Sequence, residues 1–258
     1  MSDAAPSSPT LTFVGTGEAC DPQLPNTSLL YRGGRVVLID CGYSVPAALW
    51  RVTTDVNLID AIYISHLHAD HSFGLPGLLL WMREGGRERA LTIIGGPGLE
   101  PWLERLLDLG YPGSFTKSRA FPIEPLVADG GEPTPFGPLT LRTAPSDHSV
   151  RNLALRIEER GGSCCYSGDG APTPETRALY RDADLLVHEC WAAGPGINSH
   201  AHVEQVLELA QEARIARLCL LHIGRDSRAP VAARVAQETA GRPVLIPAPG
   251  DVVGLARA

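Results

Sequence analysis

Histidine and aspartate side chains gather in one short segment of the chain, His66-Leu-His-Ala-Asp-His71. The segment directly follows the apolar run 61–65, which predicts a strand, so its polar side chains are expected on a strand-end loop. The first two histidines can point to one centre there, while the aspartate and the last histidine point to an adjacent one. Imidazole and carboxylate groups suit zinc, manganese or iron, so the segment predicts a metal site. Ordinary surface or core histidines are the alternative.

Three further groups of this chemistry lie beside other predicted strands. His148 comes just before one apolar run, Asp169 follows another at a glycine-rich turn, and His222 ends a third. Loops at strand ends are the usual position of functional residues on a rigid scaffold. Each group also has an ordinary alternative, since Asp169 suits a turn and His222 suits a buried, hydrogen-bonded histidine. Together with the first segment, they favour a metal site.

The elements that must position these groups follow from the apolar pattern. Continuous apolar runs predict strands that are covered on both faces. Strands are expected at 11–15, 28–32, 35–40, 61–65, 91–95, 139–144, 152–158, 163–167, 184–189, 218–222 and 244–247. Helices are expected at 45–53, 75–84, 99–109, 174–181, 203–213 and 230–238. Residues 110–138 are rich in Gly and Pro and form the least regular part. Antiparallel pairs come first and again in the middle, which predicts an α/β class with two mixed sheets and outer helices.

The composition is that of an ordinary globular chain. Hydrophobic residues make up 44% and charged residues 20% of the 258 positions, which excludes wholesale disorder. No apolar run is long enough to cross a bilayer, and the first ten residues lack the features of a secretory signal. The six cysteines form no CxxC pair and suggest reduced thiols. We therefore expect a cytoplasmic protein, with a disordered tail at residues 1–10 and a single domain over residues 11–258.

The order of the motifs resembles the metallo-β-lactamase superfamily, and more closely its ribonuclease Z-like branch. The most specific piece is the stretch SHLHADHSFGLPG at residues 65–77, and the likeness extends over nearly the whole chain. Further matching pieces lie at residues 15–17, 25–28, 40–42, 94–98, 146–149, 167–169, 183–189, 199–200 and 220–222. The resemblance implies an αββα sandwich, in which two mixed sheets pack face to face between outer helices, and a metal-dependent hydrolase.

Carried over residue by residue, the resemblance implies a dinuclear site for two divalent ions, zinc first, with manganese or iron as alternatives. One ion would be held by His66, His68 and His148, the other by Asp70, His71 and His222, and Asp169 would bridge them.

The resemblance also implies the catalytic groups. A glutamate and a histidine that assist catalysis in the family match Glu189 and His200, and Asp70 is assigned to catalysis as well as to metal binding. A hydroxide bridging the ions would attack the substrate. His200, oriented by Glu189, would protonate the leaving group or stabilise the oxyanion. His188 is expected to be structural, whereas His202 suits a helix cap or supporting role as well as a substrate contact.

The chain departs from ribonuclease Z around the expected pocket. The long basic arm that grips tRNA in that enzyme lies between the third-motif histidine and the bridging aspartate, and here only the 20 residues 149–168 lie there. Gly170 replaces a threonine, the HEATF motif is His188-Glu-Cys-Trp-Ala192, and Ile223 replaces a serine. These departures leave the ligand set intact and concern the substrate.

We therefore predict a dinuclear metallohydrolase of a small substrate, with a phosphodiester as the first choice. The alternatives are a carboxylic-ester, lactone or thioester hydrolase on the same metals, a tRNA 3′-end endonuclease, and a non-catalytic metal or ligand sensor. The missing arm and the net charge of −7, without a Lys/Arg run, argue against nucleic acid as a partner. The expected partner is a small molecule, no membrane is expected, and a homodimer is left open.

Overall fold

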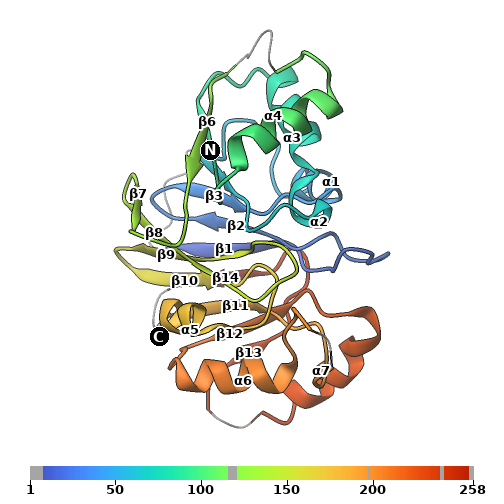
Figure 1. Cartoon of the computed structure of the whole chain (residues 1–258), viewed down its shortest axis with the longest axis vertical. Coiled ribbons are helices and arrows are strands. Elements are labelled where there is room, and N and C mark those ends of the chain that lie inside the picture. Colours follow the sequence, from blue (N-terminus) through green and yellow to red (C-terminus); the bar gives the residue numbers. More distant parts are fainter. Residues whose placement is uncertain (1–7, 116–120, 197, 239–240, 256–258) are drawn as a thin grey trace.

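Two sheets lie face to face, with helices on both outer faces (Figure 1). The computed structural model describes residues 8–115, 121–196, 198–238 and 241–255. Within these residues, the first sheet comprises β1 (Thr10–Gly15), β2 (Ser28–Arg32), β3 (Val36–Ile39), β4 (Ala61–Tyr63), β5 (Leu91–Gly95), β6 (Ile123–Val127) and β14 (Val252–Gly254), in the order β14-β1-β2-β3-β4-β5-β6. The second comprises β7 (Thr134–Phe136), β8 (Leu139–Pro145), β9 (Leu153–Glu159), β10 (Gly162–Tyr166), β11 (Leu185–Glu189), β12 (Leu218–Leu221) and β13 (Val244–Leu245), in the order β13-β12-β11-β10-β9-β8-β7.

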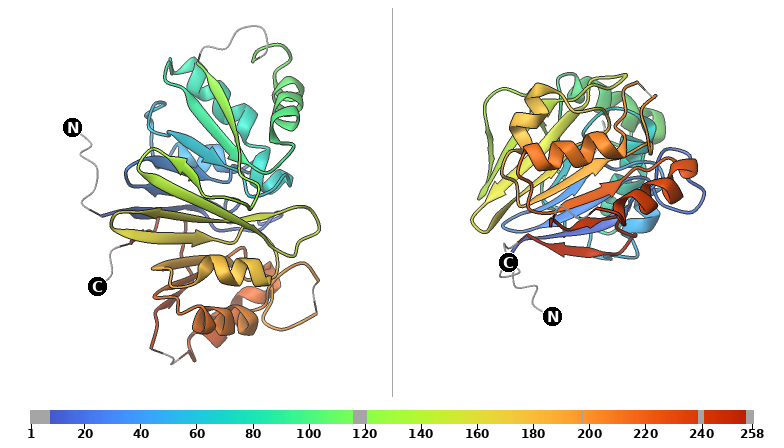
Figure 2. Two further views of the ribbon diagram at one scale, coloured as in Figure 1. Left: turned by 60° about the vertical axis from the view of Figure 1, so that its left-hand side comes forward. Right: turned by 90° about the horizontal axis from the view of Figure 1, so that it is seen from below.

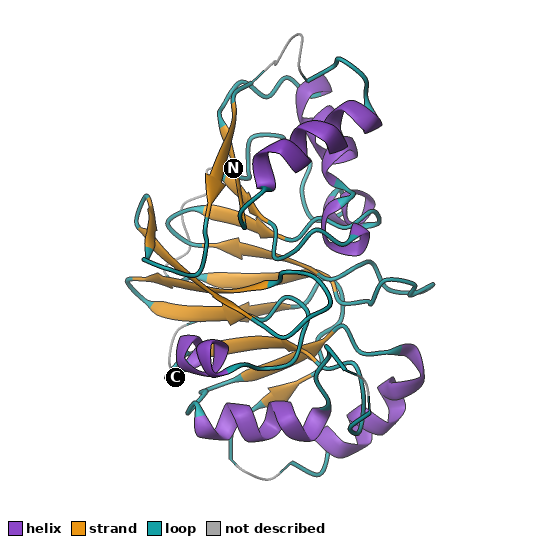
Figure 3. Ribbon diagram, in the orientation of Figure 1, coloured by secondary structure: helices purple, strands orange, loops and turns teal. Residues whose placement is uncertain are grey.

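Helices cover the outer face of each sheet (Figures 2 and 3). The first sheet is covered by α1 (Val45–Leu49), α3 (Leu75–Glu84) and α4 (Leu99–Gly110), and the second by α5 (Pro174–Tyr180), α6 (Val203–Glu212) and α7 (Arg228–Val235). The single-turn helix α2 (Ala69–Ser72) follows β4, and a 3₁₀ turn (Arg225–Ser227) precedes α7. This arrangement confirms the predicted αββα sandwich.

Alternating side chains on the strands build three apolar layers. On β2, Leu29 and Tyr31 enter the core between the sheets, whereas Leu30 packs against the first-sheet helices. On β11, Val187 enters the core between the sheets and Leu186 packs under α6. Because successive side chains of a strand point to opposite faces, a strand covered on both faces must be apolar throughout. This is why the strands that carry the site are continuous apolar runs.

Segments that the sequence pattern missed lie mainly at the sheet edges. The stretch 110–138, expected to be the least regular, contains β6 and β7, and the short β14 was also not expected. Strand β6 contains Pro125 and, among the strands of the described residues, pairs with β5 alone, at the edge of its sheet. A proline is tolerated there because no further strand needs its missing N–H group. Because proline is rare inside strands, the same residue explains why the sequence pattern did not predict a strand here.

The ends of the described chain bear on two expectations. Strand β1 begins at Thr10, the last residue of the expected tail, and residues 1–7 of that tail lie outside the described residues. None of the helices in the described part of the chain has the length and apolar character that a bilayer crossing requires.

Candidate metal centre

Several strands end at one edge of the sandwich, and polar residues lie at or just after these ends. Strands β3 and β4 run parallel in the first sheet, and β10, β11 and β12 run parallel in the second. Parallel strands place their carboxyl ends at the same sheet edge, where ligand sites of α/β proteins form. The residues at these ends are Asp40 after β3, His66 after β4, Asp169 after β10, Glu189 on β11 and His222 after β12. The structure thus assembles groups that lie up to 182 positions apart.

Three ring nitrogens converge at one side of the site. His66 Nε2 lies 3.1 Å and His148 Nε2 lies 3.3 Å from His68 Nδ1. The opposite nitrogens of two rings are fixed, because His66 Nδ1 faces Ser65 Oγ at 3.0 Å and His148 Nδ1–H donates to Ser199 O at 2.9 Å. The Nε2 lone pairs of both rings therefore face His68, which as a neutral ring has one N–H to offer. Such converging lone pairs suit a metal cation.

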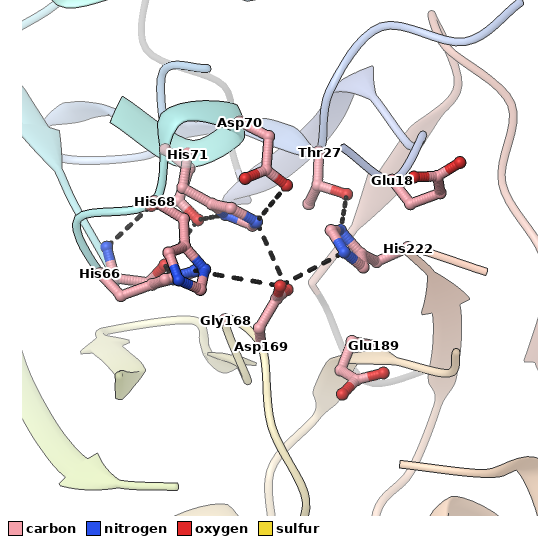
Figure 4. A network of polar contacts seen from close by, with 12 residues as sticks. Glu18, Thr27, His66, His68, Asp70, His71, Gly168, Asp169, Glu189 and His222 are labelled. Carbon is pink, nitrogen blue, oxygen red and sulfur yellow. Dashed lines mark hydrogen bonds and ion pairs between the residues drawn. The ribbon is translucent and has the colours of Figure 1, made fainter. Parts of the chain in front are cut away.

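A second set lies beside the first and is joined to it by Asp169 (Figure 4). His71 Nε2 lies 3.3 Å from Asp70 Oδ2 and 3.4 Å from Asp169 Oδ1. The other oxygen, Asp169 Oδ2, lies 3.3 Å from His222 Nε2 and 3.9 Å from His66 Nε2. Asp169 therefore occupies the position that the sequence analysis gave to a bridging ligand.

The polar atoms of this second set fit a cation better than they fit one another. His71 Nε2 and Asp169 Oδ1 are buried and have no hydrogen-bond partner. An unsatisfied buried polar atom costs about 1–3 kcal/mol, which binding of a cation between them would offset. The donor set, imidazole nitrogen with carboxylate oxygen, is one that zinc, manganese and iron accept.

The buried groups of the site shift one another's pKa values in different directions. Burial would raise the pKa of Asp169, but the charges of His222 and His71 outweigh it and hold that pKa well below its usual range. Burial also opposes the charged form of His71, yet Asp169 and Asp40 raise its pKa well above the ordinary value. Burial and the neighbouring His71 charge lower the pKa of His66, which keeps its ring neutral. The site thus combines an ionised carboxylate with a free imidazole lone pair.

Asp40 orients two of the predicted ligands, a role that the sequence analysis did not assign. Its Oδ2 accepts from His71 Nδ1–H at 2.7 Å and from the Tyr166 hydroxyl at 2.7 Å. Ser65 donates its N–H to Oδ1 at 2.7 Å and its hydroxyl to Oδ2 at 2.8 Å. Because that hydroxyl hydrogen is used on Asp40, Ser65 Oγ accepts from His66 Nδ1–H. A carboxylate behind a histidine fixes its tautomer and raises its basicity. The position of Asp40 at the end of the apolar run that predicts a strand was the signal in the sequence that could have revealed this supporting role.

Two further residues support the second set. Thr27 donates its hydroxyl hydrogen to Gly17 O, so it accepts from His222 Nδ1–H, the two atoms being 3.2 Å apart. Asn152 Oδ1 accepts from Asp169 N–H at 3.2 Å and holds the loop that carries Asp169. The loop turns at Gly168, where φ is +60° and a Cβ would lie 2.1 Å from Asn152 Oδ1. Only glycine fits this close approach.

Backbone strain is concentrated around the site. Within the described residues, five non-glycine residues have positive φ, and three of them are Asp40, Ser199 and His222, at +58°, +68° and +52°. The left-handed region costs a non-glycine residue about 1–3 kcal/mol, and such residues cluster at functional sites. Each of the three aims a group into the site or at one of its ligands.

Glu189 and His200 form the pair that the sequence analysis predicted. His200 Nδ1–H donates to Glu189 Oε1 at 3.1 Å, and the carboxylate also accepts backbone N–H groups from Gly170, Ala201 and Trp191 at 2.9–3.0 Å. Burial would lower the pKa of His200, but the hydrogen bond to Glu189 outweighs it and raises that pKa. The ring lies 5.0 Å from the His148 ring, so a proton held on its Nε2 is near the predicted ligands.

The remaining histidines and aromatic residues divide between structural and site positions. His188 is buried, packs against Tyr180 and donates to Glu189 O, which matches its expected structural role. His202 is the N-cap of α6, where its Nδ1 accepts from Gln205 N–H at 3.5 Å. The ring of Trp191 lies 4.9 Å from His200 and 5.9 Å from His222. The fold therefore brings the Trp191 ring against two histidines of the site.

Comparison with known proteins places the chain in a family. A family described as "Anti-Pycsar protein Apyc1" matches residues 9–239. The chain belongs to this family. Among curated relatives of this Apyc1-family protein, ribonuclease Z of Methanosarcina acetivorans is 27% identical over 267 residues, covering 83% of this chain and 87% of the relative. Ribonuclease BN of Cronobacter sakazakii is 28% identical over 273 residues, covering 82% of this chain and 88% of the relative.

Solved structures share the fold of this Apyc1-family protein. The metallo-β-lactamase fold protein YhfI from Bacillus subtilis aligns with a TM-score of 0.81 at 21% identity, covering 96% of this chain and 99% of that one. Human tRNase Z, short form, aligns with a TM-score of 0.79 at 21% identity, covering 96% of this chain and 100% of that one. A diphosphatase from the PhnP family aligns with a TM-score of 0.74 at 20% identity, covering 95% of this chain and 97% of that one.

These findings confirm the predicted metallo-β-lactamase superfamily and its ribonuclease Z-like branch. The protein is a metal-dependent hydrolase, as predicted, and hydrolases of this fold use a dinuclear metal site.

Proposed function

We propose that this protein hydrolyses a small phosphodiester with two divalent metal ions, zinc in the first place. The observation that carries the proposal is the position of Asp169 between the two ligand sets: its Oδ1 faces His71 and its Oδ2 faces His222, both of the second set, and Oδ2 also lies 3.9 Å from His66 Nε2 of the first. In the proposal, one ion is held by His66, His68 and His148, the other by Asp70, His71 and His222, and Asp169 contacts both. Glu189 and His200 lie outside these seven ligands and act on the substrate side.

The chemistry divides between the ions and the chain. Two divalent ions, when bound, supply Lewis acidity that activates water near neutral pH and neutralises charge on phosphoryl oxygens. Asp40, Ser65 and Thr27 hold the histidine rings so that a lone pair faces the centre. His200 is held through Nδ1 by Glu189, which leaves Nε2 to donate a proton to the leaving oxygen as the phosphorus–oxygen bond breaks. Asp70 would hold an ion together with His71, whose Nε2 lies 3.3 Å from Asp70 Oδ2.

Two observations favour a small phosphodiester. Relatives carry the name ribonuclease Z, and a diphosphatase of the PhnP family shares the fold, so phosphate ester chemistry recurs among them. The 20 residues 149–168 form a loop, β9, a turn, all of β10 and the start of the loop after it, which leaves no room for a basic arm. The net charge of −7, without a Lys/Arg run, also argues against tRNA as the substrate.

A substrate panel tests the proposal. The protein reconstituted with zinc or manganese is assayed on bis(p-nitrophenyl) phosphate, p-nitrophenyl phosphate, p-nitrophenyl acetate, a lactone and precursor tRNA. We expect the diester to be turned over fastest, His68→Ala to abolish that turnover, and His202→Ala, which replaces another half-buried histidine, to retain it.

Other outcomes of the panel identify other functions. Faster cleavage of the acetate or lactone would overturn the phosphodiester assignment in favour of carboxylic-ester chemistry. Trimming of precursor tRNA by substoichiometric protein at physiological salt would overturn the small-substrate assignment. No turnover of any compound with either metal would favour a metal or ligand sensor.

A further inference from the structure

The indole ring of Trp191 packs against two histidines of the site at once. Its centroid lies 4.9 Å from that of the His200 ring, at an interplanar angle of 31°, and 5.9 Å from that of the His222 ring, at 40°. The two imidazole rings lie 6.1 Å apart and are 11° from parallel. Trp191 thus links the predicted proton donor to a predicted ligand of the second set.

The backbone of Trp191 is held at both of its polar groups. Trp191 N–H donates to Glu189 Oε2 at 2.9 Å, and the other oxygen of this carboxylate accepts from His200 Nδ1–H at 3.1 Å. Trp191 O accepts at 3.0 Å from the N–H of Gly224, which lies two residues after His222. The hydrogen bonds of the backbone therefore tie Trp191 to the same two parts of the site that its ring contacts.

Gly224 leaves the space in which the indole ring lies. A Cβ at Gly224 would lie 2.8 Å from Trp191 O, 3.4 Å from Cε2 and 3.5 Å from Nε1 of the indole. The φ of Gly224 is −52°, which other residues adopt as well, so the close approach of Trp191 requires glycine here and the backbone conformation does not. A threonine at position 191, as in the HEATF motif, would offer no ring to fill this space.

The hydrogen bond to Glu189 fixes only one atom of the His200 ring. A single bond of 3.1 Å leaves the ring free to tilt, and tilting would turn the Nε2–H direction away from the leaving oxygen. The indole face restricts this tilt, and the His148 ring meets the imidazole edge-on, with centroids 5.0 Å apart at 76°. A functional side chain needs such packing as well as its hydrogen bond to keep a productive orientation.

We infer that Trp191 is a positioning residue, whose indole ring holds the plane of His200 so that Nε2–H points at the leaving oxygen. The inference rests on the proposed phosphodiester hydrolysis, since it concerns the proton transfer in that reaction. Trp191 acts through His200 and takes no part in the bond changes. A well-aimed donor matters more as the leaving oxygen becomes more basic, so the effect of Trp191 depends on the leaving group.

Two diesters that differ only in the leaving group test the inference. Trp191→Leu keeps an apolar side chain beside His200 but offers no flat face. In the zinc-loaded protein, we expect this variant to lower kcat for methyl phenyl phosphate ~10–100-fold, as misplacement of a reacting group does. KM should change little, and the loss of kcat should be far smaller for methyl p-nitrophenyl phosphate, because nitrophenolate leaves without protonation.

Three variants accompany Trp191→Leu. Trp191→Phe keeps a ring and should restore most of the lost kcat. Gly224→Ala, whose Cβ would displace the indole, should show the same dependence on the leaving group and tests the inference independently of the fold of Trp191→Leu. Trp102→Ala, at another half-buried tryptophan, on α4, is the control and should affect both diesters alike.

Proton NMR separates failure of this inference from failure of the proposed function. The downfield Nδ1 proton of His200, assigned by its absence from His200→Ala, should persist in zinc-loaded wild type and Trp191→Phe and be lost by exchange in Trp191→Leu. Equal effects on both diesters with an unchanged proton signal would overturn the positioning role and retain the hydrolysis. No turnover by the wild type, with the signal lost in Trp191→Leu, would overturn the hydrolysis and retain the hold on His200. No turnover and an unchanged signal would overturn both.

Discussion

Replacing Asp40 by asparagine should weaken metal binding without altering any predicted ligand. The Asp40 carboxylate is fully buried and accepts four hydrogen bonds, one at Oδ1 from Ser65 N–H and three at Oδ2 from Ser65 Oγ, His71 Nδ1 and the Tyr166 hydroxyl, all at 2.7–2.8 Å. An amide has only one oxygen. One orientation of the asparagine therefore turns its NH₂ group towards three donors, and the other turns it towards one.

The structure sets the size of the effect. The favoured orientation keeps the oxygen on His71 and loses the bond from Ser65 N–H, and an unsatisfied buried donor costs about 1–3 kcal/mol of unfolding free energy. His71 keeps a hydrogen-bond acceptor but loses a charged one. Loss of such a partner behind a metal-binding histidine typically costs about 10–100-fold in affinity, or about 1.4–2.8 kcal/mol. We expect that loss at the ion assigned to His71.

Asp184→Asn is the matched control. Asp184 Oδ2 accepts from Ser163 N–H at 2.8 Å and from Ser163 Oγ at 2.9 Å, the same pair of donors that Ser65 offers to Asp40. It lies just before β11, at the opposite end of that strand from Glu189. Zinc affinity is measured by competition with a chromogenic chelator, and stability by chemical denaturation of the metal-free protein. Asp184→Asn should bind zinc as tightly as the wild type. If Asp40→Asn also binds zinc as tightly as the wild type, whatever stability it loses, Asp40 is structural and the reasoning fails.

Three further predictions follow from the same site. Asp169→Ala should reduce metal content at both positions, whereas Asp70→Ala should reduce it at one; elemental analysis of reconstituted protein measures this, and an equal content in both variants would contradict a bridging role. His200→Ala should keep the metals and the fold but lose ~10²–10⁴-fold in turnover, with a smaller loss for a nitrophenol leaving group; full activity towards a poor leaving group would make the Glu189–His200 pair structural. Glu189 raises the pKa of His200 above its ordinary 6.5 despite burial, so the proton-donating form persists above that pH and kcat should fall as pH rises through the raised pKa. Glu189→Gln should move this fall to lower pH in a pH–rate profile, and a fall that stays in place would assign it to another group.

The sequence by itself determined the class of fold and the residue types of the predicted metal ligands, because both depend on short segments of the chain. The six residues from His66 to His71 contain four side chains of the types that bind metals, directly after an apolar strand. The continuous apolar runs predicted strands covered on both faces, and β2, β11 and β12 are covered in that way. Residue type and local period suffice for such features, since neither depends on what the rest of the chain does.

Only the tertiary structure decided which groups support the ligands. Asp40 reaches Tyr166 across 126 positions, and Thr27 reaches His222 across 195. Asn152 contributes through the loop of Asp169 although its own segment carries no motif. No local pattern encodes a contact of this length, because it exists only where two sheets bring their strand ends to one edge. The sheet-edge strands β6 and β14 were hidden for a related reason, since pairing with a neighbour rather than apolar period defines them.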